Sequence, residues 1–196
     1  MFTGIVQGLG ALQRRSRGEV EIGLPASIRE RLTIGGSIAV NGVCLTVTGL
    51  TDGSFRADVS AETAARTTLG RIRPEERVNL ELPLSLSSPL DGHLVLGHVD
   101  AIGRIEALYR EHSDWILIVS YPSEYRRYVV EKGAVAIDGV SLTPYGLEGN
   151  TLRCAVIPET RERTNLKDRK SGDPVNIEFD IMAKYVEGMI RVVHKG

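Results

Sequence analysis

The sequence predicts an all-β protein with two tandem, similar six-stranded antiparallel β-barrels, short helices and a C-terminal α-helix. Three observations predict this fold class. One stretch of sequence occurs twice, short apolar runs alternate with turn residues in both copies, and an amphipathic pattern follows the second copy. A chain of 196 residues is long enough to bury a core in each copy.

The repeat is visible in NGVCLTVTGL, residues 41–50, and DGVSLTPYGL, residues 138–147. A shift of 97 aligns residues 36–70 with 133–167 without a gap, and fifteen of these 35 positions are identical. A period near 90 residues is too long for a solenoid and suits a small domain. The expected units are a first barrel at 1–92, a second at 93–180, and a helix at 181–196.

Each copy consists of short runs rich in β-branched and apolar residues, separated by Gly, Asn, Asp and Pro. In the first copy these runs are FTGIVQ, VEIGL, SIAVNGVCLTVTGL, SFRADV and RVNLEL. They predict strands joined by turns. Two segments, PASIRERL and AETAARTTL, predict short helices, and SEYRRYVVEK and ETRERTNL match them in the second copy. About six strands per copy favour a closed barrel, because closure removes exposed sheet edges.

The last segment, DIMAKYVEGMIRVVHKG, lies beyond both copies. Ile181, Tyr185, Met189 and Val193 recur at a spacing of four, which predicts an amphipathic helix. A helix with one apolar face needs a covering surface, and a second copy of the chain is the expected one.

Composition narrows the classes of partner. The formal charge is −1, with 24 basic and 25 acidic residues and no run of one sign, so we expect no nucleic acid and no anionic membrane as partner. No apolar run approaches the roughly 20 residues that span a bilayer. The two cysteines lie outside any C-x-x-C spacing and the first residues are broken by glycine, which predicts a cytoplasmic protein with free thiols.

Cys44 and Ser141 occupy equivalent positions in the repeat. Small side chains beside a glycine-rich turn are often structural, and for a lone cysteine this is the simpler interpretation. However, Thr46 and Thr143 follow two residues later, so in each strand two polar groups point to the same side. Such a pair lines a polar pocket or faces water.

The remaining candidates are histidines and acidic residues. His93 and His98 lack a third ligand at metal spacing, so a proton-transfer role for His98 is favoured over a metal site, with a surface imidazole as the alternative. Asp58 and Glu62, with neighbouring hydroxyls, fit either the start of a short helix or a site for a polyhydroxylated ligand.

Six motifs in order, MFTGIV, NGVCLTV, GHVD, IDGVSLT, IPET and a helix after VNIEFD, closely resemble the riboflavin synthase family, the alpha-chain type with two lumazine-binding repeats. The resemblance covers essentially the whole chain. It implies a dismutation of two 6,7-dimethyl-8-ribityllumazine molecules to riboflavin and 5-amino-6-(D-ribitylamino)uracil, the last step of riboflavin biosynthesis, without cofactor or metal. It also implies a homotrimer with active sites between barrels of neighbouring subunits, and a possible association with lumazine synthase.

The resemblance assigns residues to two pockets. The N-terminal pocket is expected to contain Gly4, Ile5, Val6, Cys44, Leu45, Thr46, Asp58, Val59, Ser60, Ala61, Glu62 and Thr63. The C-terminal pocket is expected to contain Gly97, His98, Val99, Ser141, Leu142, Thr143, Val156, Ile157, Pro158, Glu159, Thr160 and Arg161, with Lys132 reaching across from a partner chain.

Within these pockets the resemblance implies four catalytic residues. His98, Ser141 and Thr143 would handle the proton at the 7-methyl group of one lumazine, and the thiol of Cys44 would activate or orient the other. Phe2 and Thr3 are expected to help close the site, as the N-terminal segment does in the family.

Pro144 departs from the family pattern, and a proline there must lie at a sheet edge or a bulge.

Two other functions compete with the enzyme. Lumazine-binding antenna proteins resemble the same double barrel, hold one ligand and catalyse nothing. A purely structural tandem barrel would leave Cys44, His98 and Ser141 without a shared role. The presence of Ser141, Thr143, His98 and the apolar helix face favours the enzyme.

Overall fold

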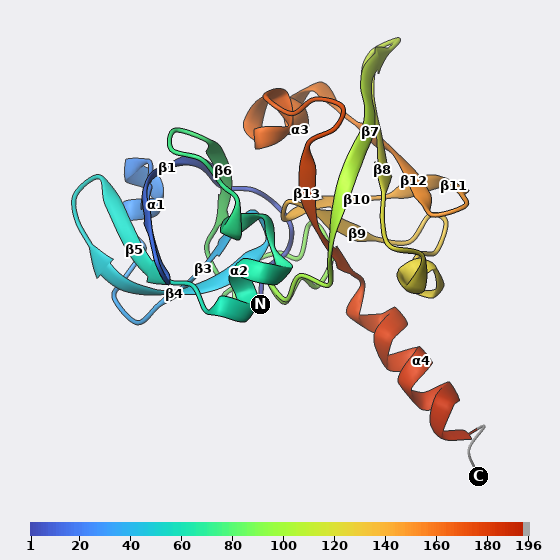
Figure 1. Cartoon of the computed structure of the whole chain (residues 1–196), viewed down its shortest axis with the longest axis horizontal. Coiled ribbons are helices and arrows are strands. Elements are labelled where there is room, and N and C mark those ends of the chain that lie inside the picture. The colour runs from blue at the N-terminus through green and yellow to red at the C-terminus, as the bar shows by residue number, and fades with distance from the viewer. Residues whose placement is uncertain (194–196) are drawn as a thin grey trace.

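The computed structural model describes residues 1–193, with the side chains of residues 191–193 excluded. It consists of two β-rich units side by side and a helix that projects away from the second unit (Figure 1). The expected fold class is confirmed. The side chain of Val193, which was predicted for the apolar helix face, lies outside the described part of the structure. Residues 194–196 lie outside it entirely. In the described chain no helix is long and apolar enough to cross a membrane.

The first unit is a closed barrel with strand order β1-β2-β5-β4-β3-β6. Its strands are β1 (Gly8–Ser16), β2 (Glu19–Gly23), β3 (Ser37–Val40), β4 (Val43–Leu50), β5 (Ser54–Asp58) and β6 (Arg77–Glu81). Its short helices are α1 (Ala26–Arg29), α2 (Ala61–Arg66) and the 3-10 turn η1 (Thr68–Gly70). Alternate residues of β4 are buried and exposed, so its apolar side chains fill the barrel interior.

The second unit repeats this topology with one strand divided in two. Its strands are β7 (Ala101–Glu111), β8 (Asp114–Ser120), β9 (Val135–Ile137), β10 (Val140–Leu142), β11 (Pro144–Glu148), β12 (Thr151–Val156) and β13 (Pro174–Phe179). Its helical turns are η2 (Ser123–Tyr128), α3 (Pro158–Arg163) and η3 (Asn165–Lys167). The strand order is β10-β9-β13-β7-β8-β12-β11, so β10 and β11 lie at its two ends. Only Thr143 separates these two strands in the sequence, and together they correspond to β4.

Pro144 lies at a sheet edge and a bulge, as predicted. It begins β11, an end strand of the sheet, at a register shift between Pro144 and Gly146. The first barrel has the equivalent shift between Val47 and Gly49. The proline therefore occupies a bulge that both copies share, and it removes the bond that the equivalent Val47 N donates to Gly36 O in the first barrel.

One expected strand is absent. The run FTGIVQ at residues 2–7 forms no named strand, and its single sheet contact is a bridge from Phe2 to Val95. Strand β1 begins only at Gly8. The run forms no strand because it crosses from one barrel to the other, and its polar backbone groups are satisfied by partners outside a ladder.

The two units meet at a buried polar network that repeats the internal symmetry. Asn79 N donates to Asn41 Oδ1 at 2.7 Å, and Asn176 N donates to Asp138 Oδ1 at 2.8 Å. The amide groups then cross the interface, since Asn79 Nδ2 donates to Asp138 O and Asn176 Nδ2 donates to Asn41 O, both at 2.8 Å. Buried polar groups are costly unless paired, so this network fixes how the barrels associate.

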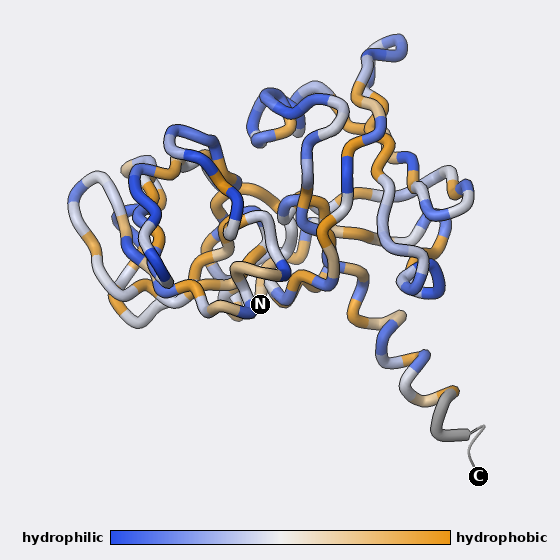
Figure 2. Tube along the Cα trace, in the orientation of Figure 1, coloured by the Kyte–Doolittle hydropathy of each residue, from blue (hydrophilic) through white to orange (hydrophobic). Residues whose placement is uncertain are grey.

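The C-terminal helix α4 (Ile181–Val193) is tied to the second barrel by charged groups. Lys184 Nζ lies 2.6 Å from Asp100 Oδ2, and Arg127 Nε lies 2.7 Å from Glu187 Oε1. Apolar and polar residues alternate along the projecting helix (Figure 2). Its exposed apolar side chains are Met182, Tyr185, Val186, Met189 and Ile190. The predicted amphipathic helix is therefore present, with an apolar face that the single chain leaves exposed.

Replacing Asn176 by alanine tests the interface network. The substitution leaves the carbonyl of Asn41 and the N–H of Thr68 buried without their present partner. We expect Asn176→Ala to lower the free energy of unfolding by about 2 to 4 kcal/mol in urea titrations. The matched control is Asn150→Ala, which removes one partly exposed bond to Tyr121 O and should cost about 1 kcal/mol or less. Equal losses in the two variants would contradict the role of the network.

Candidate functional site

Two buried glutamates hold the segments that precede each barrel. Glu81, at the end of β6, accepts hydrogen bonds from Thr3 N at 2.6 Å and Gly4 N at 3.0 Å. Glu178, at the equivalent place in β13, accepts from Leu96 N at 2.6 Å and Gly97 N at 2.9 Å. Burial raises the pKa of both carboxyl groups, and the backbone donors oppose that shift.

Each held segment then contacts the opposite barrel. Ser141 N, in β10, donates to Gly4 O at 2.8 Å, and Cys44 N, in β4, donates to Gly97 O at 2.9 Å. Both glycines have positive φ, +76° and +81°. A Cβ on Gly4 would lie 2.7 Å from Ser141 Cβ, and one on Gly97 would lie 2.5 Å from Cys44 Cβ. Glycine is therefore required here for both conformation and space.

This crossing corrects the expected grouping of residues. The family resemblance predicted Gly4, Ile5 and Val6 in one pocket with Cys44, and Gly97, His98 and Val99 in the other with Ser141. The contacts are reversed, because residues 1–7 and 95–99 lead into β1 and β7 only after touching the other barrel. Phe2 is fully buried between the barrels, so in the single chain it anchors this crossing and does not cover a pocket.

The first pocket lies on the first barrel, between β4, the end of β5 and the start of α2. Its volume is about 600 Å³. Its lining is Gly18, Cys44, Leu45, Thr46, Thr48, Asp58, Val59, Ser60 and Thr63. Most of the expected N-terminal set is thus brought together, with a thiol, hydroxyls and a carboxylate around one space.

Besides Gly4, Ile5 and Val6, two further members of that expected set lie elsewhere. Glu62 is exposed and pairs with Arg66 at 3.3 Å, and Ala61 lines a neighbouring cavity. Ser60 also caps α2, since its hydroxyl accepts from Thr63 N at 3.0 Å. The capping interpretation is therefore confirmed at Ser60, which also lines the first pocket, and ligand binding there stays a prediction.

The second pocket is smaller, about 200 Å³, and lies between the crossing N-terminal segment, β10 and α3. Its lining is Gly4, Ile5, Val6, Val140, Ser141, Glu159, Thr160, Arg163 and Thr164. Several expected residues lie outside this lining: Leu142, Thr143, Val156, Ile157, Pro158, Arg161 and Lys132. Val156 is buried in the core, whereas Ile157 is half exposed.

His93 lies beside Ser141, although it is not among the predicted site residues. Its Nδ1 lies 2.7 Å from Ser141 Oγ, and its backbone N donates to Thr3 O at 3.1 Å. Burial lowers the pKa of His93, with a smaller opposing effect from Asp180, so the imidazole is neutral at neutral pH. A neutral imidazole bonded to a hydroxyl can accept a proton through it.

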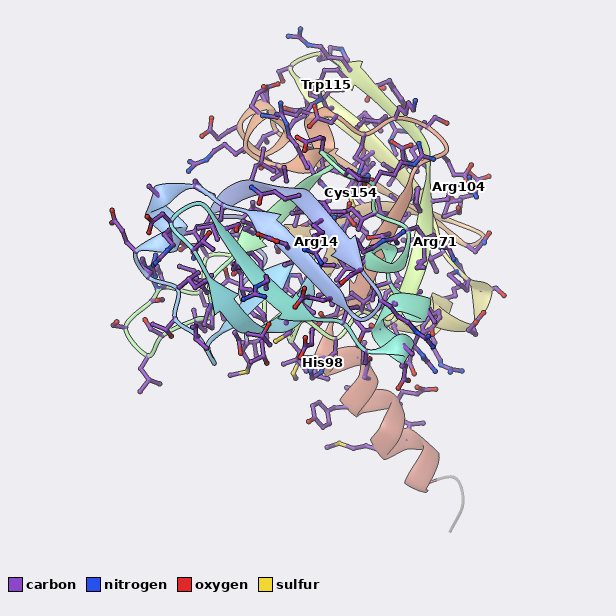
Figure 3. All side chains as sticks on the ribbon, turned by 60° about the vertical axis from the view of Figure 1, so that its left-hand side comes forward. Arg14, Arg71, His98, Arg104, Trp115 and Cys154 are labelled. Carbon is purple, nitrogen blue, oxygen red and sulfur yellow. The ribbon has the colours of Figure 1, made fainter. Side chains whose placement is uncertain are left out.

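His98, the selected histidine, has a different setting. Its backbone N donates to Glu178 Oε2 at 2.9 Å, while the residue is exposed, and Figure 3 shows its side chain at the surface. The two thiols also differ. Cys44 is half buried in the first pocket, whereas burial raises the pKa of Cys154 to about 12. Cys154 is therefore a protonated core side chain.

No group of three or more His, Cys, Asp or Glu side chains within residues 1–193 could hold a metal ion. The chemistry that the two pockets offer is proton transfer and hydrogen bonding.

A family model described as the lumazine-binding domain matches this chain twice, at residues 3–83 and 96–180. The riboflavin synthase of Mycobacterium tuberculosis (strain ATCC 25618 / H37Rv) is 46% identical, covering 97% of this chain and 98% of its own. That of Actinobacillus pleuropneumoniae is 40% identical over 95% and 88%, and that of Bacillus subtilis (strain 168) is 35% identical over 100% and 91%.

Solved structures of LumP share the fold. LumP complexed with riboflavin has a TM-score of 0.86 at 23% identity, covering 91% of this chain and 99% of that chain. LumP complexed with 6,7-dimethyl-8-(1'-D-ribityl) lumazine has a TM-score of 0.83 at 22% identity, with the same coverage.

The close approach at Gly97 can be tested with a matched glycine. Gly97→Ala and Gly35→Ala both place a Cβ at positive φ, +81° and +82°, but only Gly97 has atoms within 4 Å of the new carbon. We expect Gly97→Ala to lower the free energy of unfolding by at least about 1 kcal/mol more than Gly35→Ala, because it displaces Cys44. Equal losses in urea titrations would mean that the segment does not press on β4.

Proposed function

We propose that this chain is the transferase that converts two 6,7-dimethyl-8-ribityllumazine molecules to riboflavin and 5-amino-6-(D-ribitylamino)uracil, the last step of riboflavin biosynthesis. The chain belongs to the riboflavin synthase family with two lumazine-binding domains. One lumazine donates a four-carbon unit to the other. The atoms of two lumazines equal those of the two products, so the overall reaction needs no co-reactant.

The observation that carries this proposal is the pair of unlike pockets. A reaction between two identical molecules needs two related sites, and the donor and acceptor need different chemistry. The pockets contain Cys44 and Ser141 at equivalent repeat positions. The strands that carry these residues, β4 and β10, are each hydrogen-bonded to a segment from the opposite barrel. Holding both reactants in position contributes up to about 7 to 11 kcal/mol, by making the encounter effectively unimolecular.

His93 and Ser141 supply the proton transfer in this proposal. The neutral imidazole, 2.7 Å from the Ser141 hydroxyl, accepts the proton that leaves the 7-methyl group of one lumazine. Cys44 orients or activates the lumazine in the first pocket. His98 and Thr143 lie outside the linings of both pockets in the single chain, and we assign them to proton handling at a site completed by a neighbouring subunit, as the family resemblance implies.

The assembly we propose is a homotrimer, in which the first barrel of one chain faces the second barrel of the next and Lys132 reaches across. The exposed apolar face of α4 supports such an assembly. We also propose the division into units 1–92, 93–180 and 181–196, a cytoplasmic location, and an association with lumazine synthase, each from the family resemblance.

The antenna-type alternative is less well supported. The LumP structures share the fold at 22 to 23% identity, whereas named riboflavin synthases match nearly the whole chain at 35 to 46%. Ser141 and its partner His93 also give the second pocket groups that pure binding does not require.

Substitutions at the dyad test the proposed chemistry. We expect Ser141→Ala and His93→Gln each to lower steady-state riboflavin formation from the lumazine alone by about 10²-fold or more, with unchanged unfolding curves. His112→Gln, at an exposed hairpin turn, is the matched control. Wild-type turnover should persist below pH 6.5 and fall only at more acidic pH, because burial lowers the pKa of His93. Full activity in both dyad variants would exclude their role.

Removal of α4 tests the assembly. A chain ending at Phe179 loses the exposed apolar face and the contact of Lys184 with Asp100. We expect this chain to sediment as a monomer that binds lumazine but forms little riboflavin. Met189→Lys in the full chain should dissociate the trimer in the same way while keeping the ion pairs of the helix. A trimer that survives both changes would show that another surface assembles the protein.

A further inference from the structure

The C-terminal helix begins beside the carboxylate that holds the segment before β7. Strand β13 carries Glu178 and runs directly into α4, where Lys184 lies at the start of the helix (Figure 1). Lys184 Nζ lies 2.6 Å from Asp100 Oδ2, and only 22% and 18% of these two side chains are exposed. Solvent therefore screens this ion pair less than an exposed one, and both of its charges act on the carboxyl group of Glu178.

The first barrel has the same arrangement with a neutral side chain. Gln7 corresponds to Asp100, because GIVQ in the first copy matches GHVD in the second. Gln7 Oε1 accepts a hydrogen bond from Leu82 N at 3.3 Å, and Asp100 Oδ2 accepts one from Phe179 N at 2.9 Å. The contact is the same, but the amide is neutral and the carboxylate is charged. The backbone contact therefore does not require an acidic residue at this position.

The negative charge of Asp100 disfavours the ionised form of Glu178. Burial raises the pKa of Glu178 most, and the nearby carboxylate of Asp100 raises it further. The first barrel also gives its buried carboxylate a hydroxyl donor, since Thr3 Oγ1 donates to Glu81 Oε1 at 2.8 Å. Leu96 occupies the position of Thr3 in the second copy. The second carboxylate therefore has a like charge nearby and lacks this side-chain donor.

Lys184 offsets these two differences. The backbone donors and the charge of Lys184 lower the pKa of Glu178. Asp100 is held in place by contacts outside the helix, since Tyr125 Oη donates to its carbonyl and Phe179 N donates to its carboxylate, both at 2.9 Å. Removing the lysine would therefore leave two carboxylates close together without the cation that pairs with Asp100. Like charges in such a place favour protonation of one of them.

The ionised form matters because Glu178 holds its segment by accepting hydrogen bonds. Its two oxygens accept from the N–H groups of Leu96, Gly97 and His98 at 2.6, 2.9 and 2.9 Å. Protonation turns one oxygen into a donor, which conflicts with the N–H groups that face it. The same segment places Gly97 against Cys44 of the first pocket. A protonated Glu178 would therefore loosen the segment and change the wall of that pocket.

We propose that Lys184 is a positioning residue of the site, whose charge allows Glu178 to act as the carboxylate anchor of residues 96–98. The helix that carries the exposed apolar face thereby also sets the geometry of the segment that presents His98. Assembly and site geometry are then linked through one ion pair within the chain. The inference rests on the proposed function, which assigns His98 to proton handling at a site completed by a neighbouring subunit.

Amide hydrogen exchange of the full-length protein tests this role without relying on turnover. We expect Lys184→Met to speed exchange at residues 96–98 by about tenfold or more, because the anchor loosens. The segment that Glu81 holds in the first barrel is an internal control and should keep its protection. Lys170→Met, at an exposed lysine of the second barrel, is the matched control and should change neither segment. Lys184→Arg keeps the charge and should retain the wild-type protection.

A compensating substitution separates the charge of Lys184 from a mere tether. Asp100→Asn, added to Lys184→Met, removes the like charge and still accepts from Phe179 N, as Gln7 accepts from Leu82 N. We expect Lys184→Met to lower kcat about tenfold with a smaller change in KM, and the double variant to recover most of both kcat and protection. The acid limb of the pH–rate profile should move to higher pH in Lys184→Met, because loss of the lysine raises the pKa of Glu178, and should return in the double variant.

Exchange is compared between chains that sediment alike, so that assembly does not confuse the result. If Lys184→Met sediments like the wild type, the comparison is with Lys170→Met. If it dissociates, the comparison is with Met189→Lys at a concentration at which both are monomeric, because that variant keeps the ion pair of Lys184. Unchanged exchange at residues 96–98, or a loss that Asp100→Asn does not recover, would overturn the proposal. Wild-type lumazine turnover tests the proposed function separately, because the exchange result can hold without any turnover.

Discussion

The architecture depends on two buried carboxylates, Glu81 and Glu178. Each lies at the end of the last strand of its barrel and accepts backbone hydrogen bonds from the segment that precedes the first strand of the same barrel. Buried charge is stable only when it is hydrogen-bonded, and these donors meet that requirement. The carboxylates hold both segments in an orientation in which Gly4 and Gly97 reach the opposite barrel. This crossing joins the barrels alongside the buried amide network of Asn79 and Asn176, and it sets Ser141 and Cys44 against segments from the opposite barrel.

Duplication provides two related sites, and local substitutions make them different. The interface network repeats almost atom for atom around Asn41 and Asp138, so the scaffold is symmetric where it joins the barrels. The symmetry ends at the pockets. Ser141 acquires a histidine partner, and the cation–π pair of Trp115 and Arg161 stands where the first barrel has Gly18 and Ala64. A symmetric frame with unlike contents suits a reaction in which two identical molecules have different roles.

The sequence predicted the fold because the repeat and the alternation of apolar residues are local signals. Pro144 was also placed correctly, since a missing N–H restricts it to an edge or bulge. The crossing of residues 1–7 and 95–99 was missed, because it depends on hydrogen bonds between residues 53 to 137 positions apart, which no periodicity encodes. His93 was missed for a related reason. It lies in the linker outside the aligned repeat, and its contact with Ser141 spans 48 positions.

The central claim is that one chain provides two sites for the same heterocycle, one on each barrel. The most direct measurement is the number of 6,7-dimethyl-8-ribityllumazine molecules bound per chain, determined by equilibrium dialysis of the wild-type protein under conditions that prevent turnover. The account predicts two per chain. A saturating value of one per chain would contradict it, because the second barrel would then be a structural copy and not a reaction site.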